Sequence, residues 1–160
     1  MNIIQKIQSL FKSSPNTPAN IDGQWAGYYG YGDQYPEVTR KKVVKFMAQI
    51  NVDGDEFEGF IKEDETNGIP EIAKIDGILR GRKIAFVKTY SRTYGVDQNG
   101  VRTVISEHPQ YISYSGVHNE SQNKFVGQWK IETMYKSSDG STRTQISIGH
   151  WEMTKLGNIE

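Results

Sequence analysis

Three Gly-polar-Trp triplets decide the fold of this chain: Gly23-Gln24-Trp25, Gly127-Gln128-Trp129 and Gly149-His150-Trp151. They contain all three tryptophans of the protein, and each lies in a run that alternates large and small residues with a period of two. On a strand, a glycine two residues before a tryptophan lies on the same face and leaves room for the indole, so a neighbouring strand can pass close by. One triplet near the start and two near the end indicate a sheet that closes on itself.

The composition is typical of one globular domain without metal or disulfide support. At 160 residues the chain is long enough to bury its own core. Nineteen lysines and arginines balance 19 aspartates and glutamates, so no net charge attracts nucleic acid or an anionic membrane, and neither partner is expected. The absence of cysteine excludes thiolate zinc sites and thiol nucleophiles. No apolar stretch approaches the roughly 20 residues of a membrane span, and residues 1–7 lack the apolar region of a signal peptide, so a cytoplasmic protein is expected.

The chain divides into a short helix, a linker and a β domain. Five apolar residues follow helical spacing and predict an amphipathic helix within residues 1–12: Ile3, Ile4, Ile7, Leu10 and Phe11. This helix is expected to pack on the domain, and a mobile lid or a membrane-surface anchor are the alternatives. Residues 13–22 contain two prolines and form the predicted linker. Residues 23–156 then form the predicted barrel domain.

Period-two alternation and turn signals predict the strands of that domain. Residues 44–52 and 57–61 form the clearest hairpin, because Asp53-Gly54 separates two alternating runs. Further hairpins are predicted for 71–79 with 83–91 and for 111–118 with 125–135, between a first strand at 25–31 and a last strand at 142–155. The fold class is therefore all-β, an antiparallel up-and-down barrel of about eight strands, which is enough to hold one small ligand. Residues 94–110 form the longest irregular segment and the expected flap at its mouth.

Gly23-Gln24-Trp25, at the head of the first strand, resembles the Gly-x-Trp signature of calycin barrels, which include the lipocalins, the fatty-acid-binding proteins and the avidins. Four later segments are similar in order and spacing to the later strands of the avidin family: 84–90, 114–116, 127–129 and 149–155. The resemblance covers roughly residues 23–156 and implies a calycin-type barrel.

The avidin resemblance also implies a partly retained ligand pocket. Phe86, Tyr114 and Trp129 occupy places where that family has tryptophans. The positions that supply the polar partners of biotin in the avidin family, however, are occupied here by other residues: Gly27, Tyr31, Ile61, Glu63 and Trp151. Because an unsatisfied buried polar atom costs about 1–3 kcal/mol, biotin is not the expected ligand.

Projecting the alternation inward gives a largely aromatic lining with a few polar groups, among them the hydroxyl of Tyr135. A packed barrel interior needs such residues whatever the protein does, but hydroxyls above an apolar floor are also how a pocket orients a small molecule. If Glu63 and Lys88 point inward they need each other or a ligand, and otherwise they reach solvent at the rim. The candidate ligand-binding residues are Tyr29, Tyr31, Glu63, Phe86, Lys88, Tyr90, Tyr114, Trp129 and Trp151.

These features predict non-catalytic binding of a small apolar or aromatic molecule. The sequence nominates no catalytic residue, metal ligand or cofactor, since it has no Ser-His-Asp order, no HExxH motif and no phosphate-binding glycine loop. One alternative is a filled barrel that acts as a scaffold in a homo-oligomer or with another partner. Phe60, Val126 and Met134, predicted on the outer face, favour that alternative.

A second alternative rests on the opening of the β domain. Its Gly-x-Trp-x-Gly run, followed by Gly30, Gly32 and Tyr35-Pro36, resembles the opening of nitrobindins, which are haem-binding barrels. That resemblance implies haem ligation through His150. By strict alternation, however, His150 lies on the opposite face from Trp151, so an inward Trp151 places His150 outside the barrel.

Overall fold

A computed structural model describes residues 3, 5 and 20–157 of the chain. A short helix, α2 (Glu37–Arg40), follows the first strand and begins after Pro36. The strands in chain order are β1 (Gly23–Tyr31), β2 (Val43–Asp53), β3 (Glu56–Glu63), β4 (Ala73–Arg80), β5 (Lys83–Tyr90), β6 (Thr93–Val96), β7 (Arg102–Ser106), β8 (Gln110–Asn119), β9 (Lys124–Lys136) and β10 (Thr142–Lys155).

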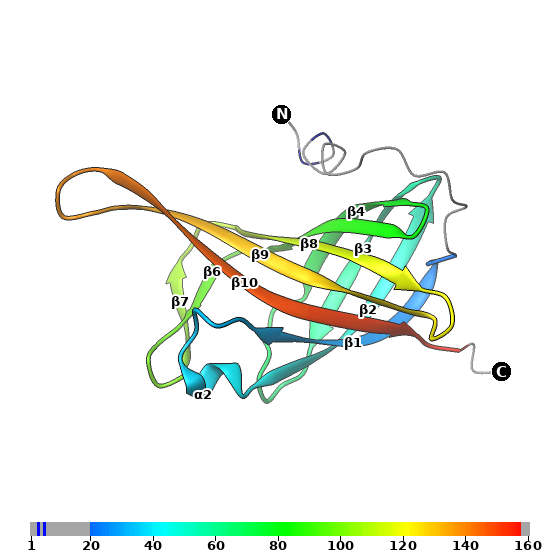
Figure 1. Ribbon diagram of the computed structural model, residues 1–160, viewed down its shortest axis with the longest axis horizontal. Helices are drawn as coiled ribbons and strands as arrows, with labels where there is room; N and C mark the ends of the chain where they lie inside the picture. Colours follow the sequence, from blue (N-terminus) through cyan, green and yellow to red (C-terminus); the bar gives the residue numbers. More distant parts are fainter. Residues whose placement is uncertain (1–2, 4, 6–19, 158–160) are drawn as a thin grey trace.

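Eight of these strands close into one antiparallel barrel in the order β1-β2-β3-β4-β5-β8-β9-β10, with β10 paired to β1 (Figure 1). Each strand pairs with the next along the chain, except that the β6–β7 hairpin is inserted between β5 and β8. The predicted all-β, up-and-down barrel is confirmed. It is the architecture that the calycin resemblance implies.

Alternation along the strands decides which side chains form the core. In β2, Val44, Phe46, Ala48 and Ile50 are buried inside the barrel, while the residues between them are exposed. By alternation Val52 lies on the same face as this row, but it is 37% exposed, because it lies near the end of β2 beside the turn into β3. Period two thus predicts the face of a residue, and its position along the strand decides how deeply it is buried.

The second and third Gly-polar-Trp triplets interlock across the β9–β10 pair. Trp151 lies directly opposite Gly127, and Trp129 lies directly opposite Gly149. A Cβ at Gly149 would overlap the Trp129 ring, and one at Gly116, the β8 partner of Gly127, would lie 2.7 Å from the Trp151 ring. Each of these indoles therefore spreads over glycine on neighbouring strands, and not over the glycine of its own triplet as the sequence predicted.

The indole N–H groups find backbone acceptors inside the core. Trp25 donates to the carbonyl of Ile21 at 2.9 Å, and Trp129 donates to that of Gly30 at 2.9 Å. The Trp151 N–H lies 3.1 Å from the carbonyl oxygens of both Ser115 and Gln128. The buried indoles thus leave no donor unsatisfied, as a packed interior requires.

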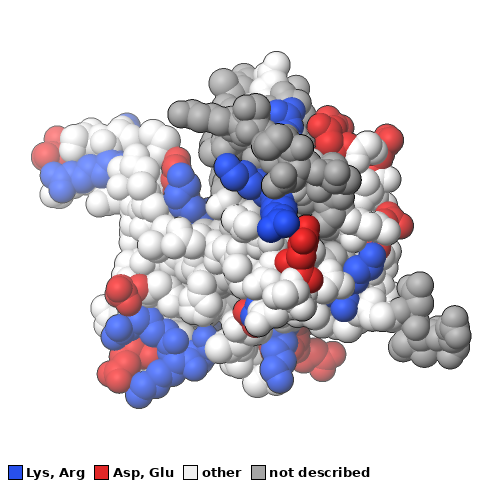
Figure 2. Space-filling view, turned by 45° about the vertical axis from the view of Figure 1, so that its right-hand side comes forward, with Lys and Arg blue, Asp and Glu red and all other residues white. Residues whose placement is uncertain are grey.

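The predicted N-terminal helix and most of the linker lie outside the described residues, apart from Ile3 and Gln5, which are helical, and residues 20–22. In the part of the chain that the structure describes, no helix has the length and apolar character to cross a bilayer. Figure 2 shows basic and acidic side chains interspersed over one face of the molecule, without a continuous field of one sign.

Candidate functional site

All nine predicted ligand-binding residues face the interior of the barrel. They come from six strands: Tyr29 and Tyr31 from β1, Glu63 from β3, Phe86, Lys88 and Tyr90 from β5, Tyr114 from β8, Trp129 from β9 and Trp151 from β10. Eight of them are at most 5% exposed, and Tyr31 is partly buried. Closure of the sheet brings them together, although they span residues 29 to 151.

An aromatic stack fills the middle of the barrel. The rings of Phe86 and Tyr114 are stacked with centroids 4.7 Å apart and planes 14° from parallel. Trp151 meets both rings edge-on, at 5.5 Å from Phe86 and 5.7 Å from Tyr114. Such contacts are those of a packed core, so these three residues form the floor of the site and not the wall of an open cavity.

A charged cluster lies above this floor, formed by Glu63, Lys88, Tyr29, Tyr90 and the ring of Tyr114. We call it the polar cluster. The Nζ of Lys88 is 3.5 Å from the Glu63 carboxylate, and both side chains are at most 1% exposed. Tyr29 and Tyr90 each donate a hydrogen bond to the same carboxylate. Of the two alternatives for Glu63 and Lys88, the inward ion pair is the one present.

The same ammonium group is surrounded by aromatic rings. The Nζ of Lys88 lies 4.6 Å from the ring centroid of Tyr29, 5.1 Å from that of Tyr90 and 5.2 Å from that of Tyr114. Cation–π attraction and the Glu63 carboxylate together offset the loss of water around the charge. Burial lowers the pKa of Lys88, and the neighbouring Glu63 opposes that shift.

Burial raises the pKa of Tyr29 and Tyr114 well above the ordinary value of 10.0, and the Glu63 carboxylate raises both further. Because the folded-state pKa lies above the unfolded one, the two tyrosines contribute stability that is present below pH 10 and is lost as the pH rises further. Lys88 contributes with the opposite sign, since its folded-state pKa is depressed.

We therefore expect the folded protein at about pH 11 to show at least two fewer ionised tyrosines than the urea-unfolded chain. Tyr29 and Tyr114 should ionise only as the barrel unfolds. A tyrosine absorbance titration, followed together with circular dichroism, measures this. Ionisation of every tyrosine while the β signal is still native would contradict the burial of the two hydroxyls.

The β6–β7 hairpin caps the polar cluster. Residues 94–110 were expected to be irregular, but β6 and β7 pair between Thr93 and Ser106. Tyr94 packs edge-on against Tyr90 and donates a hydrogen bond to Glu71 at 3.1 Å. At the turn of the hairpin, the Nζ of Lys42 donates to the Gly100 carbonyl at 2.9 Å. The segment thus lies against the polar cluster, and its predicted irregularity is wrong because two alternating β segments flank a turn there.

Arg102 of β7 connects the cap to the barrel rim. Its guanidinium donates to the Tyr31 hydroxyl at 2.6 Å and to the Asn67 carbonyl at 3.1 Å. Arg102 was not among the predicted site residues, because no local pattern around it indicates a contact with a strand 71 positions away in the sequence. Its alternation with Val104 and Ser106 predicts only that it shares their face.

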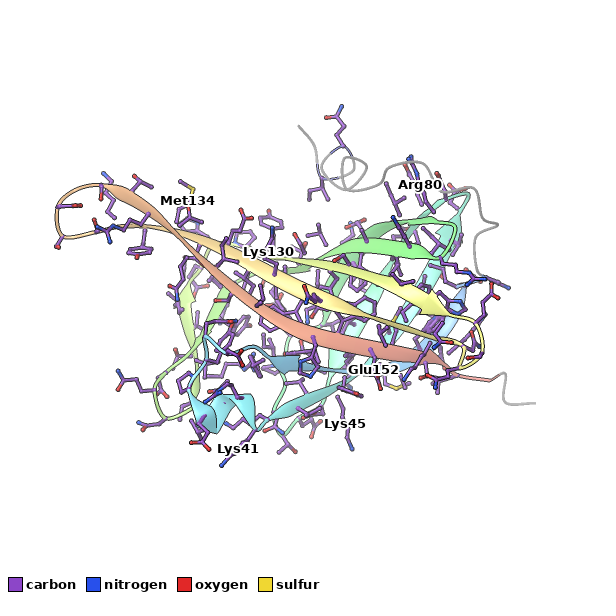
Figure 3. The ribbon with its side chains drawn as sticks, in the orientation of Figure 1. Lys41, Lys45, Arg80, Lys130, Met134 and Glu152 are labelled. Atoms are coloured by element: carbon purple, nitrogen blue, oxygen red, sulfur yellow. The ribbon has the colours of Figure 1, made fainter. Side chains whose placement is uncertain are left out.

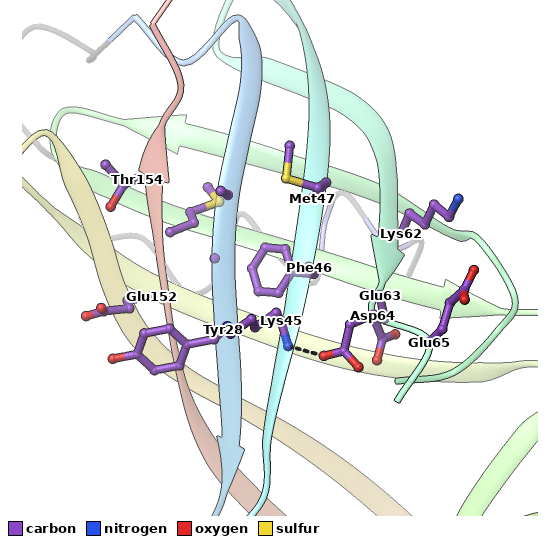
Figure 4. A pocket seen from close by; sticks show the side chains of 13 residues that line it. Tyr28, Lys45, Phe46, Met47, Lys62, Glu63, Asp64, Glu65, Glu152 and Thr154 are labelled. Atoms are coloured by element: carbon purple, nitrogen blue, oxygen red, sulfur yellow. Dashed lines mark hydrogen bonds between the residues drawn. The ribbon is translucent and has the colours of Figure 1, made fainter. Parts of the chain in front are cut away.

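Two hollows on the outside of the barrel are separate from this interior site. One of about 720 Å³ lies over β1, β2, β3 and β10, with Tyr28 and Glu152 at one side and Lys62 and Glu65 at the other (Figure 4). Its border mixes lysines with carboxylates, so it favours no single class of charged ligand. Of the predicted site residues only Glu63 belongs to its lining, and that carboxylate is bound inside the barrel.

The second hollow, of about 750 Å³, lies along β5, β8 and β9. Phe86, Tyr114 and Trp129 contribute to its lining, yet each is at most 3% exposed. The hollow therefore does not open the aromatic stack to solvent. The interior polar cluster, with its cap, remains the best candidate site.

The position of His150 does not support the haem alternative. Trp151 faces inward and is 2% exposed, whereas His150 is exposed on the outer face beside Gly30. The predicted opposition of these two residues is confirmed, and His150 does not reach the interior. Among the described residues no group of three or more His, Asp or Glu side chains is arranged to hold a metal ion.

Comparison with known proteins adds a likeness of shape. No protein-family model matches the sequence, and no curated protein matches it. Among solved structures the chain is similar to the crystal structure of rhizavidin, with 9% sequence identity, 84% of this chain and 86% of that chain covered, and a TM-score of 0.43.

Proposed function

We propose that the protein binds a small aromatic molecule with an anionic group in the polar cluster, beneath the β6–β7 cap. One observation carries the proposal. A buried ion pair, Glu63–Lys88, lies among tyrosines under a cap that is held mainly by polar contacts. A buried ion pair is weak evidence for stability, because well-packed apolar side chains in its place are often as stable. A lysine that is fully buried among tyrosines, with its pKa lowered by that burial, favours a ligand-binding role.

The cap has the features of an element that opens. None of the nine residues of β6 and β7 is fully buried. The contacts that join it to the rest of the protein include those of Arg102 and Lys42, and the contacts of Tyr94 with Gln110, Glu71 and Tyr90. Few buried apolar contacts give a segment a low free energy of local opening. Displacement of Arg102 from Tyr31 gives a molecule access to the polar cluster.

The chemistry of the cluster favours an anion on an aromatic frame. Lys88 and Arg102 supply two cationic groups against the single carboxylate of Glu63, and the pKa of Lys88 is lowered by burial. An incoming carboxylate group pairs with the two cations and restores charge balance. The tyrosine rings around Lys88 provide stacking surfaces for an aromatic frame.

We expect 2-naphthoate to raise the melting temperature and neutral 2-naphthol to raise it less. A ligand at 100 times its Kd stabilises by about 2.7 kcal/mol, which corresponds to about 5–10 °C for a chain of this length. Binding should also change tryptophan fluorescence, because the Trp129 ring lies 6.3 Å from Tyr29 and 6.0 Å from Tyr31. A thermal-shift series and a fluorescence titration provide the two measurements.

Matched variants locate the binding site. The fluorescence change should disappear in Trp129→Phe and persist in Trp25→Phe, since Trp25 packs against Phe125 at the other end of the barrel. Arg102→Ala, which opens the cap, should change the affinity, and Lys130→Ala on the outer face should not. If aromatic acids bind neither the native protein nor the Arg102→Ala variant, the polar cluster is only a structural core.

A further inference from the structure

β9 and β10 extend beyond the barrel as a two-stranded arm. They pair continuously from Lys124–Thr154 to Lys136–Thr142. β8 pairs with β9 only as far as Lys130, and β1 pairs with β10 only as far as Gly149. Ile131 still packs against the core, and the Ile148 carbonyl still accepts a hydrogen bond from the Gly32 N–H. Residues 132–136 and 142–146, which we call the arm, project beyond them (Figure 1).

The β9 edge of the arm is an open template for pairing. Within the described residues, no strand pairs with residues 131–136 on the side where β8 would continue. Apolar side chains on the arm are strongly exposed, with Met134 at 72% and Ile146 at 52%, and Met134 lies on the arm beyond Lys130 (Figure 3). Tyr135, which alternation placed among the inward hydroxyls, is 46% exposed because the arm has left the barrel. An exposed edge of this kind pairs readily with another strand.

The side chains of this edge are complementary to a second copy of themselves. In an antiparallel pair of identical strands related by a two-fold axis, opposite residues must lie on the same face, so the axis passes through a residue position. With the axis at Met134, Glu132 lies opposite Lys136 of the second copy, and this pair occurs twice. Thr133 lies opposite Tyr135, and the two Met134 side chains meet on the axis.

Other registers are less favourable. With the axis at Thr133, Lys130 faces Lys136, and with the axis at Glu132 the two glutamates face each other. With the axis at Tyr135, Glu132 faces Ser138 and both ion pairs are lost. Opposite charges directly across a strand pair are stabilising and like charges are destabilising. The Glu132–Lys130 ion pair within the strand, at 3.0 Å, has side chains that are about half exposed, so solvent screens it.

We propose that the protein forms a symmetric homodimer by antiparallel pairing of β9 arms about Met134. The dimer joins two arms into a four-stranded sheet, which satisfies the open backbone edge of each copy. It places the exposed Met134 and Ile146 side chains of both copies on one shared face. The occupant of this edge is therefore a second copy of the chain.

Cysteine cross-linking tests the register directly, because the chain contains no cysteine. The full-length Met134→Cys variant should form a disulfide dimer under mild oxidation, since directly opposite residues of an antiparallel pair have Cα atoms about 4.5–5.5 Å apart, within the range of about 4.4–6.8 Å that a disulfide spans. Thr144→Cys is the matched control. Thr144 lies opposite Met134 within one chain, on β10. Its two copies are separated by three strand spacings, about 14 Å, which is too far for a disulfide.

Charge reversal tests the interface in solution. Sedimentation equilibrium of the native chain should show a monomer–dimer equilibrium, and Glu132→Lys or Lys136→Glu should each weaken dimerisation by about tenfold or more. The double variant, or an equimolar mixture of the two single variants, should restore it, because opposite charges again face each other. A chain that stays monomeric at about 100 μM, which is well above the Kd of a specific dimer, would overturn the proposal. A dimer that is insensitive to charge reversal, or that cross-links at Thr144→Cys and not at Met134→Cys, would equally overturn it.

Discussion

Gly127→Ala is expected to prevent formation of a stable barrel. A Cβ at Gly127 would overlap the Ser115 carbonyl oxygen and lie 2.6 Å from the Cα of Gly116, both of which are backbone atoms. Backbone atoms cannot rotate away as a side chain does, so β8 and β9 would have to separate and Trp151 would lose its place above them. We expect a loss of at least about 3 kcal/mol in the free energy of unfolding, a large share of a domain's stability.

Urea unfolding followed by near-ultraviolet circular dichroism measures this loss, because the packed aromatic rings dominate that signal. Gly157→Ala is the matched control. It adds the same methyl group where no atom lies within 4 Å, and its stability should equal that of the native chain. A Gly127→Ala protein as stable as this control would mean that β8 and β9 do not approach as closely as the structure has them.

Lys88→Met should destabilise the barrel by about 3–5 kcal/mol, because it leaves the buried Glu63 carboxylate without its counter-charge. Glu63→Gln should also be destabilising, since it leaves the ammonium group of Lys88 among the tyrosine rings without an anion. The double variant should be more stable than the sum of the two losses predicts, because neither side chain then carries a buried charge. A double-mutant cycle from urea unfolding measures this coupling.

The exposed ion pair Lys41–Glu37 is the control for this cycle. Its side chains are 75% and 71% exposed, and their nitrogen and oxygen atoms are 3.1 Å apart. Because solvent screens such a pair, Lys41→Met should change stability little. Losses at Lys88 and Glu63 that simply add would indicate that the two groups do not interact, which would contradict the ion pair.

The local alternation of the sequence was sufficient to predict on which face of the sheet most side chains lie. Alternation predicted that Phe86, Tyr114 and Trp129 point inward, because side chains on a strand change sides at every residue. It also predicted opposite faces for Trp151 and His150. Alternation does not state where a strand leaves the barrel, so it placed the exposed Tyr135 among the inward hydroxyls.

The candidate site could be predicted only in part from the sequence. The nine predicted residues all lie in the interior, but sequence left Glu63 and Lys88 undecided between the core and the rim. That choice depends on the β6–β7 cap, which comes from another part of the chain and brings Arg102 over the cluster. Its contacts join residues 71 and 35 positions apart, and no local pattern encodes such a separation.

The amino-acid sequence by itself determined an all-β barrel and the inward face of most of its strands. These properties depend on neighbours a few residues away, through the two-residue period of a strand and the turn preferences of Asp-Gly. Only the tertiary structure decided that Trp129 packs over Gly149 and Trp151 over Gly116, that a hairpin covers the polar cluster and that β9 and β10 extend beyond the barrel. These outcomes depend on strand register and on the length over which neighbouring strands pair, which are properties of the closed sheet and not of any single segment.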